Sequence, residues 1–516
     1  MHCVAVLVST FLVLSGDRAT PVKQRGDNYP VYLGRAVYDW GADLKQSDAA
    51  TRRLAAFALG KFGPFAAHYG ADLRSAMDDS DAGVREAAAT ALGEIGPLAG
   101  AQAIPALKRA LADDADPAVR RSAANSLGRI EQYRQEAFIP LRLALTDADA
   151  RVRQSAAWAL GQLTGSIDIT EAVLPLRSLL SDPDSLVRRD AAAALGSVGP
   201  GAKAAVANLT VALADADPVV RPNAAAALGK IGPASEAAVP ILVRLVQDVK
   251  TEEDLRHQAA FALSQIGGSK VAQALPQLRE CLRDKDIVIR RYISAVFLNH
   301  GDHAQFYLPD LAGALSDEAT DVRQNVSAAI EKAARHAEEP AVKFLVPLLV
   351  KALQNDPDET VRRNLAWIFL NLSVNLRAKE FASVKDALIR IAIADKAFDV
   401  RSNLARACVA QFGAEARDVA PSLIESLKQP HNKLRVVKNT NAKADSGRVE
   451  GGDGTTSLQE EEAGDGRAIA AEFLGRLGSA AGPAAKQALE EAAQDPDSKE
   501  LRDAAKRALE KIRVKD

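Results

Sequence analysis

The sequence predicts an all-α protein, built as a solenoid of about 13 stacked helix pairs. Two observations support this fold class: a unit recurs along almost the whole chain, and each copy has apolar residues at helical spacing. Asp184–Pro200 reads D-S-L-V-R-R-D-A-A-A-A-L-G-S-V-G-P, and close copies lie at Asp81–Pro97 and Asp217–Pro233. Neither helix of a pair can bury its apolar stripe alone, so pairs must stack on one another.

An arginine in each copy marks the period. Successive copies are 33 to 39 residues apart, except for one step of 66 residues between Arg401 and Arg467. A fixed period of this size is the signature of a solenoid. The aligned residues are Arg52, Arg85, Arg120, Arg153, Arg188, Arg221, Arg256, Arg290, Arg323, Arg362, Arg401, Arg467 and Arg502.

Each unit contains an amphipathic helix whose two ends are visible in the sequence. Val187, Ala191 and Leu195 fall on one helical stripe. Asp184 stands at the N-cap position, and Gly199 stands where the helix should end. Pro222 is a departure, because a proline one residue after the arginine removes a backbone donor unless the helix starts late.

A shorter apolar pattern precedes each of these helices and predicts the first helix of a pair. Examples are residues 172–180, A-V-L-P-L-R-S-L-L, and residues 238–246, A-V-P-I-L-V-R-L-V. Prolines recur in or near its first turn, where a missing N–H costs little.

The consensus D-x-x-V-R-x-x-A-A-x-A-L-G-x-I-G resembles that of HEAT repeats, particularly the short bacterial type also seen in phycobilin-lyase-like proteins. The resemblance covers about residues 35–429 and 463–514. It implies a right-handed superhelix, in which turn aspartates and helix arginines form a structural ladder between repeats. By resemblance the ladder uses Asp81, Arg85, Asp116, Arg120, Asp149, Arg153, Asp184, Arg188, Asp217 and Arg221.

The expected domain organisation follows the repeat boundaries. Residues 1–19 are interpreted as a signal peptide and residues 20–34 as an extended lead-in. Residues 35–429 form the HEAT-repeat solenoid, and residues 466–516 form C-terminal HEAT repeats and a cap. Between them, residues 430–465 are polar and glycine-containing, and we expect a disordered insertion.

The N-terminus leaves two localisations open. Val4–Leu14 is an apolar run of 11 residues, too short to span a bilayer and suited to a signal peptide. This predicts an exported protein, periplasmic or extracellular, without an integral membrane segment after signal removal. Met1–Cys3 contains no Lys or Arg, which a signal peptide normally has, so a cytoplasmic protein is the alternative.

Composition and motifs argue against several kinds of chemistry. The 65 basic and 67 acidic side chains are balanced, which disfavours binding of nucleic acid. His300 and His303 are the best metal-like cluster, but the sequence supplies no third and fourth ligand, so a polar turn is the better interpretation. Cys281 and Cys408 are interpreted as buried thiols. We therefore predict no catalytic residue, no metal site and no cofactor.

The most informative departures from the repeat lie on the second helices. Aromatic residues stand five positions after the arginine in four repeats, and Lys or amide side chains follow them four positions later, on the same helix face. By resemblance, second helices line the concave surface, and the Trp367–Asn371 spacing resembles the peptide clamp of armadillo repeats. The expected binding residues are Arg53, Phe57, Trp158, Gln162, Phe261, Gln265, Arg363, Trp367 and Asn371. The alternative is that the rings pack between repeats.

These observations predict a non-catalytic, monomeric scaffold that binds a protein or peptide partner on its concave face. The alternative function is an enzyme accessory or bilin-lyase-like protein that holds a small ligand in the second half of the chain.

Overall fold

The computed structural model describes residues 23–24, 30–99, 103–165, 167–334, 339–375, 381–429 and 465–513. These residues are almost entirely helical, so the predicted all-α class is confirmed. The chain divides into two compact units, residues 1–266 (unit 1) and residues 267–516 (unit 2), and each is described by itself.

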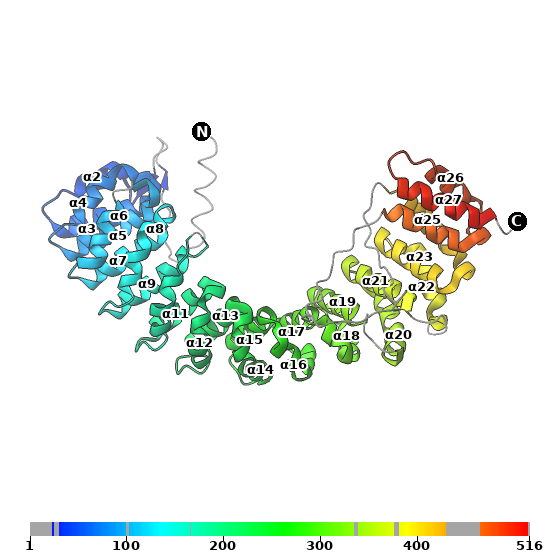
Figure 1. The fold of residues 1–516 in the computed structure, drawn as a ribbon. Helices are drawn as coiled ribbons and strands as arrows, with labels where there is room; N and C mark the ends of the chain where they lie inside the picture. Colours follow the sequence, from blue (N-terminus) through cyan, green and yellow to red (C-terminus); the bar gives the residue numbers. More distant parts are fainter. Residues whose placement is uncertain are drawn as a thin grey trace, which may run out of the picture. The chain divides into compact units, whose positions relative to one another are not determined.

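In unit 1, first and second helices alternate along the chain and form two layers (Figure 1). The first helices are α2 (Val37–Asp43), α4 (Gly70–Ala76), α6 (Ala103–Asp113), α8 (Arg134–Ala144), α10 (Val173–Leu179), α12 (Val206–Ala212) and α14 (Val239–Gln247). The second helices are α3 (Ala49–Phe62), α5 (Ala82–Ile95), α7 (Pro117–Arg129), α9 (Ala150–Leu163), α11 (Ser185–Val198), α13 (Val220–Ile231) and α15 (Glu253–Ile266). Each second helix packs against the next second helix, so the second helices make a continuous layer.

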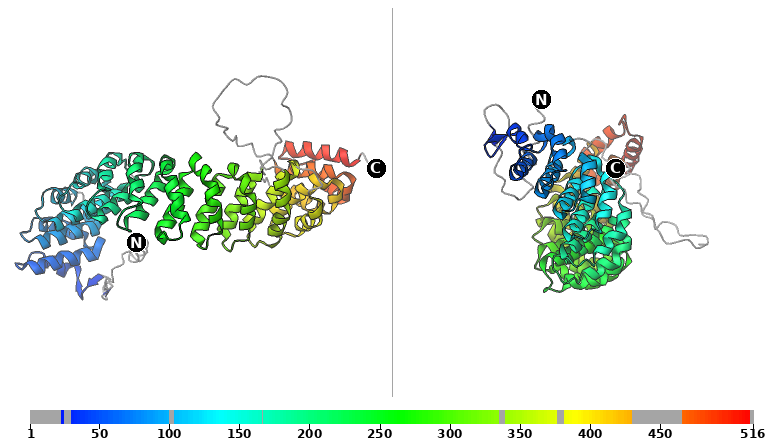
Figure 2. Two further views of the ribbon diagram at one scale, coloured as in Figure 1. Left: turned by 90° about the horizontal axis from the view of Figure 1, so that it is seen from below. Right: turned by 90° about the vertical axis from the view of Figure 1, so that its left-hand side faces the viewer.

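Unit 2 repeats this arrangement, and its helix pairs follow one another in sequence order (Figure 2). Its first helices are α16 (Gly268–Leu278), α18 (Leu308–Ala314), α20 (Glu339–Asn355), α22 (Lys385–Ala394), α24 (Ala420–Leu427) and α26 (Gly482–Ala492). Its second helices are α17 (Ile287–Asn299), α19 (Thr320–Ala334), α21 (Glu359–Asn375), α23 (Phe398–Phe412), α25 (Gly466–Leu477) and α27 (Lys499–Arg513).

Short 3₁₀ segments join many second helices to the following first helix. They allow a sharp reversal because a 3₁₀ turn is tighter than an α-helical turn. They are η2 (Gly63–Tyr69), η3 (Gly96–Ala99), η4 (Glu131–Tyr133), η5 (Thr170–Ala172), η6 (Gly199–Ala205), η7 (Gly232–Ala238), η9 (Gly301–Tyr307), η11 (Ala382–Val384), η12 (Gly413–Val419) and η13 (Gly478–Ala481). Another 3₁₀ segment, η8 (Arg279–Arg283), instead lies between the first helix α16 and its second helix α17.

A small antiparallel sheet precedes α2, and the sequence analysis did not predict it. Its strands are β1 (Lys23–Gln24), β2 (Pro30–Tyr32) and β3 (Arg35–Ala36), in the order β1-β2-β3. Trp40 of α2 is buried and donates from its indole N–H to the Tyr32 carbonyl oxygen at 3.3 Å. The Arg35 guanidinium lies 4.1 Å from the centre of the Trp40 ring. These contacts hold the sheet against the first helix pair.

The predicted ends of the second helices are confirmed in α11. The Asp184 side chain accepts hydrogen bonds from the backbone N–H groups of Leu186 and Val187, and Gly199 follows the helix with a φ of 66°. A positive φ is the conformation that glycine adopts without strain.

The helix that contains Pro222 starts late, which is the arrangement that accommodates this proline. Helix α13 begins at Val220, three residues after Asp217, whereas α11 begins directly after Asp184. Pro222 therefore falls in the first turn, where its missing N–H leaves no intrahelical bond broken.

Alanine and glycine let successive second helices approach closely. A Cβ atom placed on Gly128 of α7 would lie 2.6 Å from the Cβ atom of Ala159 on α9. The equivalent glycine of α9, Gly161, has more room, because its nearest neighbour is the Ala194 Cα at 3.4 Å. The spacing of adjacent helices therefore differs slightly from repeat to repeat.

The segment predicted to be a disordered insertion, residues 430–465, lies outside the described residues except for Asp465. The helices on either side of it, α24 and α25, pack against each other. The insertion therefore stands between the first and second helices of a single pair. Residues 1–19, interpreted as a signal peptide, also lie outside the described residues.

Candidate functional site

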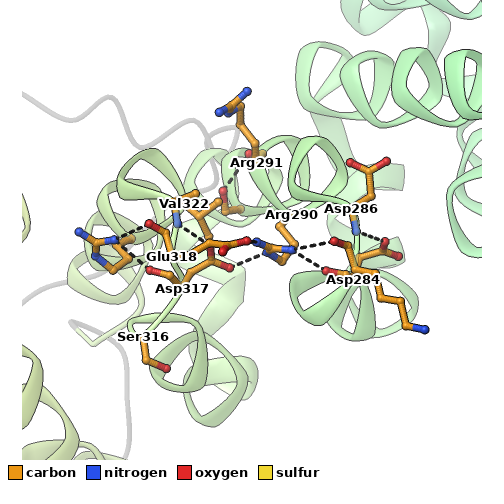
Figure 3. A network of polar contacts seen from close by, with 12 residues as sticks. Asp284, Asp286, Arg290, Arg291, Ser316, Asp317, Glu318 and Val322 are labelled. Carbon is orange, nitrogen blue, oxygen red and sulfur yellow. Dashed lines mark hydrogen bonds and ion pairs between the residues drawn. The ribbon is translucent and has the colours of Figure 1, made fainter.

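The repeated arginines form a ladder of ion pairs between consecutive repeats. In unit 1, Arg153 of α9 donates from Nε and Nη2 to the Asp182 carboxylate at 2.8 and 2.9 Å, and from Nη1 to the Asp147 carbonyl oxygen at 2.9 Å. Figure 3 shows the same arrangement in unit 2, where Arg290 lies between Asp284 and Asp317. Each arginine thus joins the turn before its own helix to the turn of the next repeat.

The ladder carboxylates are two residues earlier in the sequence than predicted. The predicted Asp81, Asp116, Asp149 and Asp184 each cap their own helix by accepting a backbone N–H. Asp217 instead accepts the N–H of Val219, the residue before the late-starting α13. The preceding aspartate in each turn faces the previous repeat instead and accepts the arginine fork. The observed pairs are Arg52–Asp79, Arg85–Asp114, Arg120–Asp147, Arg153–Asp182, Arg188–Asp215, Arg290–Asp317, Arg323–Asp356, Arg362–Asp395 and Arg467–Asp495.

Four of the five predicted ladder arginines bridge repeats through an aspartate: Arg85, Arg120, Arg153 and Arg188. The fifth, Arg221, pairs with a glutamate instead. Its Nε donates to the Asp215 carbonyl oxygen at 2.7 Å, and its Nη1 pairs with Glu252 at 2.6 Å. A single bond to a half-exposed glutamate replaces the two-pronged bond to a buried aspartate.

The ladder predicts that the protein loses stability in acid. A side-chain hydrogen bond from Arg52 holds the pKa of Asp79 below its ordinary value of 3.8, and a bond from Arg188 does the same for Asp215. Because the folded pKa is the lower one, the stabilisation is complete above about pH 4 and is lost as the pH falls through the folded pKa. We expect the urea midpoint to decrease below about pH 4. Asp215→Asn should be less stable at neutral pH and lose less on acidification, and an acid loss identical to that of the wild type would contradict this cause.

In unit 1, the predicted binding residues are only partly accessible. Phe57 is 44% exposed, with the Lys61 ammonium 5.0 Å from its ring centre. Arg53, Gln162 and Gln265 are exposed. Trp158 and Phe261 are half-buried, because each ring packs beside a glycine of the preceding second helix, Gly128 and Gly229 respectively. Both interpretations of the rings therefore hold in part: they pack between repeats and still present an edge to solvent.

In unit 2, the predicted amide clamp is wrong. Arg363 is exposed and Trp367 is half-buried, but Asn371 is only 8% exposed. Helix α21 continues four residues beyond Asn371, whereas α9 ends one residue after the equivalent Gln162. The position thus lies inside a longer helix instead of at an exposed helix end, and the Asn371 side chain is buried.

Only some of the arginines that follow the ladder positions are available for binding. Arg121 pairs with Glu86 at 2.6 Å and Arg189 pairs with Asp190 at 2.7 Å. Arg53 and Arg363 make no ion pair with any carboxylate that the structure describes. These two guanidiniums retain a full charge for a partner.

Sequence reasoning missed a second set of polar contacts, in unit 2. Asn325 donates from its amide to the Ser294 hydroxyl at 3.0 Å, and Asn364 donates to the Ser327 hydroxyl at 3.0 Å. Both asparagines stand two residues after a ladder arginine, and Asn403 occupies the same position in the next repeat. The recurrence of asparagine two residues after the arginine in three successive repeats is the sequence pattern that could have revealed these contacts. These contacts join the second helices α17, α19 and α21, and Asn364 directly follows Arg363 in the sequence.

The two histidines and two cysteines singled out in the sequence have different surroundings. Burial lowers the pKa of the half-buried His300, with smaller effects from His303 and Lys332. His303 is exposed, and no group of three metal-ligating side chains forms around the two histidines among the described residues. Cys281 and Cys408 are buried, as predicted, and form no disulfide among the described residues, and burial raises the pKa of Cys408 to about 12. A thiol with this pKa stays protonated and unreactive at neutral pH.

Comparison with known proteins identifies the same repeat family that the arginine–aspartate ladder indicates. The family model described as HEAT repeats matches residues 40–128, 139–210, 173–252 and 206–298. The chain belongs to the HEAT-repeat family. HEAT repeats generally serve as non-catalytic scaffolds for protein interaction. No curated protein matches the chain. Beyond the matched residues, the HEAT-type pairing of helices and the arginine–aspartate ladder continue in unit 2.

One helical stretch of this HEAT-repeat protein, Val220–Gln247, could cross a membrane by length and composition alone. It comprises α13, η7 and α14, which belong to two consecutive helix pairs, and 56% of its most apolar window is buried. This is the behaviour of core helices in a solenoid.

Proposed function

We propose that this HEAT-repeat protein is a non-catalytic scaffold that binds a protein or peptide partner on its second-helix layer. The observation that carries the proposal is the pairing of partly exposed aromatic rings with unpaired guanidiniums on second helices. Phe57 and Arg53 lie on α3, and Trp367 and Arg363 lie on α21. Aromatic and arginine side chains are the residues that most often carry binding energy at protein interfaces.

The chemistry of this surface suits an extended peptide better than a small ligand. Aromatic edges recur in unit 1 on α3, α9 and α15, at the same position of each helix. Exposed amides, Gln162 and Gln265, stand one turn beyond Trp158 and Phe261. A repeated set of ring and amide can hold successive residues of one chain, whereas a small ligand needs groups that converge on one point.

Peptide selection tests the proposal. A displayed peptide library is selected on the full chain and counter-selected on the Phe57→Ala/Trp158→Ala double variant. We expect the enriched peptides to lose about thirtyfold in affinity for each single alanine variant, because truncating an interface anchor costs about 2 kcal/mol.

Phe65→Ala is the matched control, since Phe65 is 51% exposed but lies on η2, outside the second-helix layer. It should leave the affinity unchanged. The proposal fails if no peptide prefers the wild type to the double variant, or if Phe65→Ala weakens binding as much as Trp158→Ala.

A further inference from the structure

Four exposed aliphatic side chains belong to the first-helix layer of unit 1. Ile139 and Leu143 of α8 are 46% and 64% exposed, Leu174 of α10 is 55% exposed, and Val211 of α12 is 75% exposed. We call these four residues the aliphatic patch. Single exposed apolar residues are normal on a folded protein, but a group of them marks a site of interaction.

The members of the aliphatic patch occupy equivalent positions in consecutive repeats. Ile139 and Leu174 each stand two residues before the fully buried leucine of their own helix, Leu141 and Leu176. Val211 stands two residues after the corresponding buried leucine of α12, and the second member on α8 has the same offset. Two residues correspond to a rotation of about 200° around an α-helix. The patch therefore lies on the side of each first helix that faces away from the core.

Unpaired positive charges border the aliphatic patch. Lys108 of α6, Arg142 of α8 and Arg177 of α10 each directly follow the buried leucine of their helix. All three are half-buried, and none makes an ion pair with a carboxylate in the part of the chain that the structure describes. Helices α10 and α12 contain no acidic residue. The patch thus combines apolar surface with positive charge that a partner can neutralise.

The arrangement of charges favours a protein partner over a lipid surface. Glu136 and Glu171 are exposed and stand three residues before Ile139 and Leu174, which is about one helical turn. These carboxylates would repel the anionic headgroups to which basic surfaces bind. Helices α10 and α12 also lack the Trp and Tyr residues that anchor proteins at a membrane interface. A protein partner can place a different group opposite each row of side chains, whereas an anionic lipid surface cannot.

The spacing of the repeats fits an α-helix that lies across the first helices. Packed helices lie about 8 to 10 Å apart, so equivalent side chains of neighbouring repeats recur at about that distance. An α-helix rises about 1.5 Å per residue, so about seven of its residues span one repeat. An aliphatic residue in each heptad would therefore meet Ile139 and Leu174 in turn, and an acidic residue beside it would meet Arg142 and Arg177.

We propose that the aliphatic patch binds an amphipathic helix of a partner protein, with aliphatic residues in every heptad and glutamates beside them. The guanidiniums supply charge-assisted hydrogen bonds to the glutamates, and burial of the aliphatic side chains supplies the apolar part of the binding energy. First and second helices form separate layers (Figure 1). The patch is therefore a second interaction surface, independent of the second-helix surface proposed for an extended peptide.

Two helical peptides test the aliphatic patch on the full chain. The acidic probe is a labelled peptide of repeated L-E-A-L-A-E-A heptads, and the basic probe has lysine in place of every glutamate. We expect the acidic probe to bind the wild type and the basic probe not to bind. Leu143→Gln and Leu174→Gln should each weaken binding of the acidic probe about tenfold, which corresponds to about 1.4 kcal/mol of lost apolar burial.

A charge variant tests the role assigned to the guanidiniums. Arg177→Gln should weaken binding of the acidic probe about fivefold, because hydrogen bonds between charged groups are lost. It should also reduce the preference for the acidic probe over the basic probe. An unchanged preference in Arg177→Gln would contradict the proposed recognition of glutamates.

Val249→Gln is the matched control, because Val249 is 79% exposed in the turn after α14 and lies outside the aliphatic patch. It should leave binding of both probes unchanged. Glutamine is a good helix former, and the replaced leucines are exposed, so Leu143→Gln and Leu174→Gln should keep the melting temperature of the wild type. An unchanged melting temperature assigns the loss of binding to the patch.

The proposal is overturned if neither probe binds, if both bind equally, or if Leu174→Gln and Val249→Gln have the same effect. Binding to phosphatidylserine vesicles that Leu174→Gln abolishes, without binding of the acidic probe, would also overturn it in favour of a lipid surface. The result is separable from that of the scaffold proposal. Trp158→Ala should bind the acidic probe as the wild type does, and Leu174→Gln should bind the peptides selected on the second-helix surface without loss.

Discussion

Replacing Asp182 by alanine is expected to destabilise unit 1 by about 3 to 5 kcal/mol, the usual cost of removing one partner of a buried ion pair. Asp182 is 8% exposed and accepts both prongs of the Arg153 fork, together with the backbone N–H of Asp184 at 3.0 Å. Its loss leaves the Arg153 guanidinium between two repeats with only carbonyl acceptors. Urea unfolding followed by circular dichroism gives the free-energy change, and amide hydrogen exchange in α9 and α11 shows whether the loss is local.

Asp184→Ala is the matched control, two residues away in the same turn. The Asp184 side chain only caps α11, so its loss should cost about 1 kcal/mol. The Arg153→Ala/Asp182→Ala double variant should be much less unstable than the sum of the single variants, because neither charge is then left unpaired. Equal costs for Asp182→Ala and Asp184→Ala would mean that the ladder does not hold consecutive repeats together.

Gly128→Ala is expected to destabilise unit 1 by about 1 to 3 kcal/mol, although alanine is a far better helix former than glycine. The new Cβ atom would lie 2.6 Å from the Ala159 Cβ and 2.8 Å from the Ala159 Cα. A backbone atom cannot move aside without separating α7 from α9, so the steric cost exceeds the gain in helix propensity. The measurement is the urea midpoint of the full chain.

Gly161→Ala is the same substitution one repeat later, where the nearest atom is 3.4 Å away. The contact there is ordinary, so this variant should be neutral or more stable by up to about 1 kcal/mol. The opposite sign of the two variants is the test. A stabilising Gly128→Ala would show that the helix spacing relaxes freely.

The fold could be predicted from the sequence because the residues that begin and end each helix recur in many repeats. Asp184 as N-cap, Gly199 at the helix end and the late start imposed by Pro222 all depend on backbone rules that act within a few residues. The sheet before α2 was missed because its strands are two or three residues long, too short for an alternating pattern to be visible.

The site was less predictable, because it depends on which of two equivalent side chains faces a neighbouring repeat. Asp182 and Asp184 are identical in chemistry and lie in the same turn, and only the packing of α9 against α11 decides which one meets Arg153. Asn371 shares a sequence position with Gln162, but the longer α21 buries it.

The ladder also gives each inter-repeat turn the same set of hydrogen-bond donors and acceptors. From Arg85 to Asp215, every arginine bonds the carbonyl of its own turn and the carboxylate of the next, and the pairs are 27 or 29 residues apart. A cut made at the same point in two turns would bring Arg85 against Asp147 in place of Asp114, with the same donors and acceptors. Whole modules can therefore be excised or duplicated between turns while the joint keeps its chemistry, which makes the length of the array adjustable in steps of one helix pair.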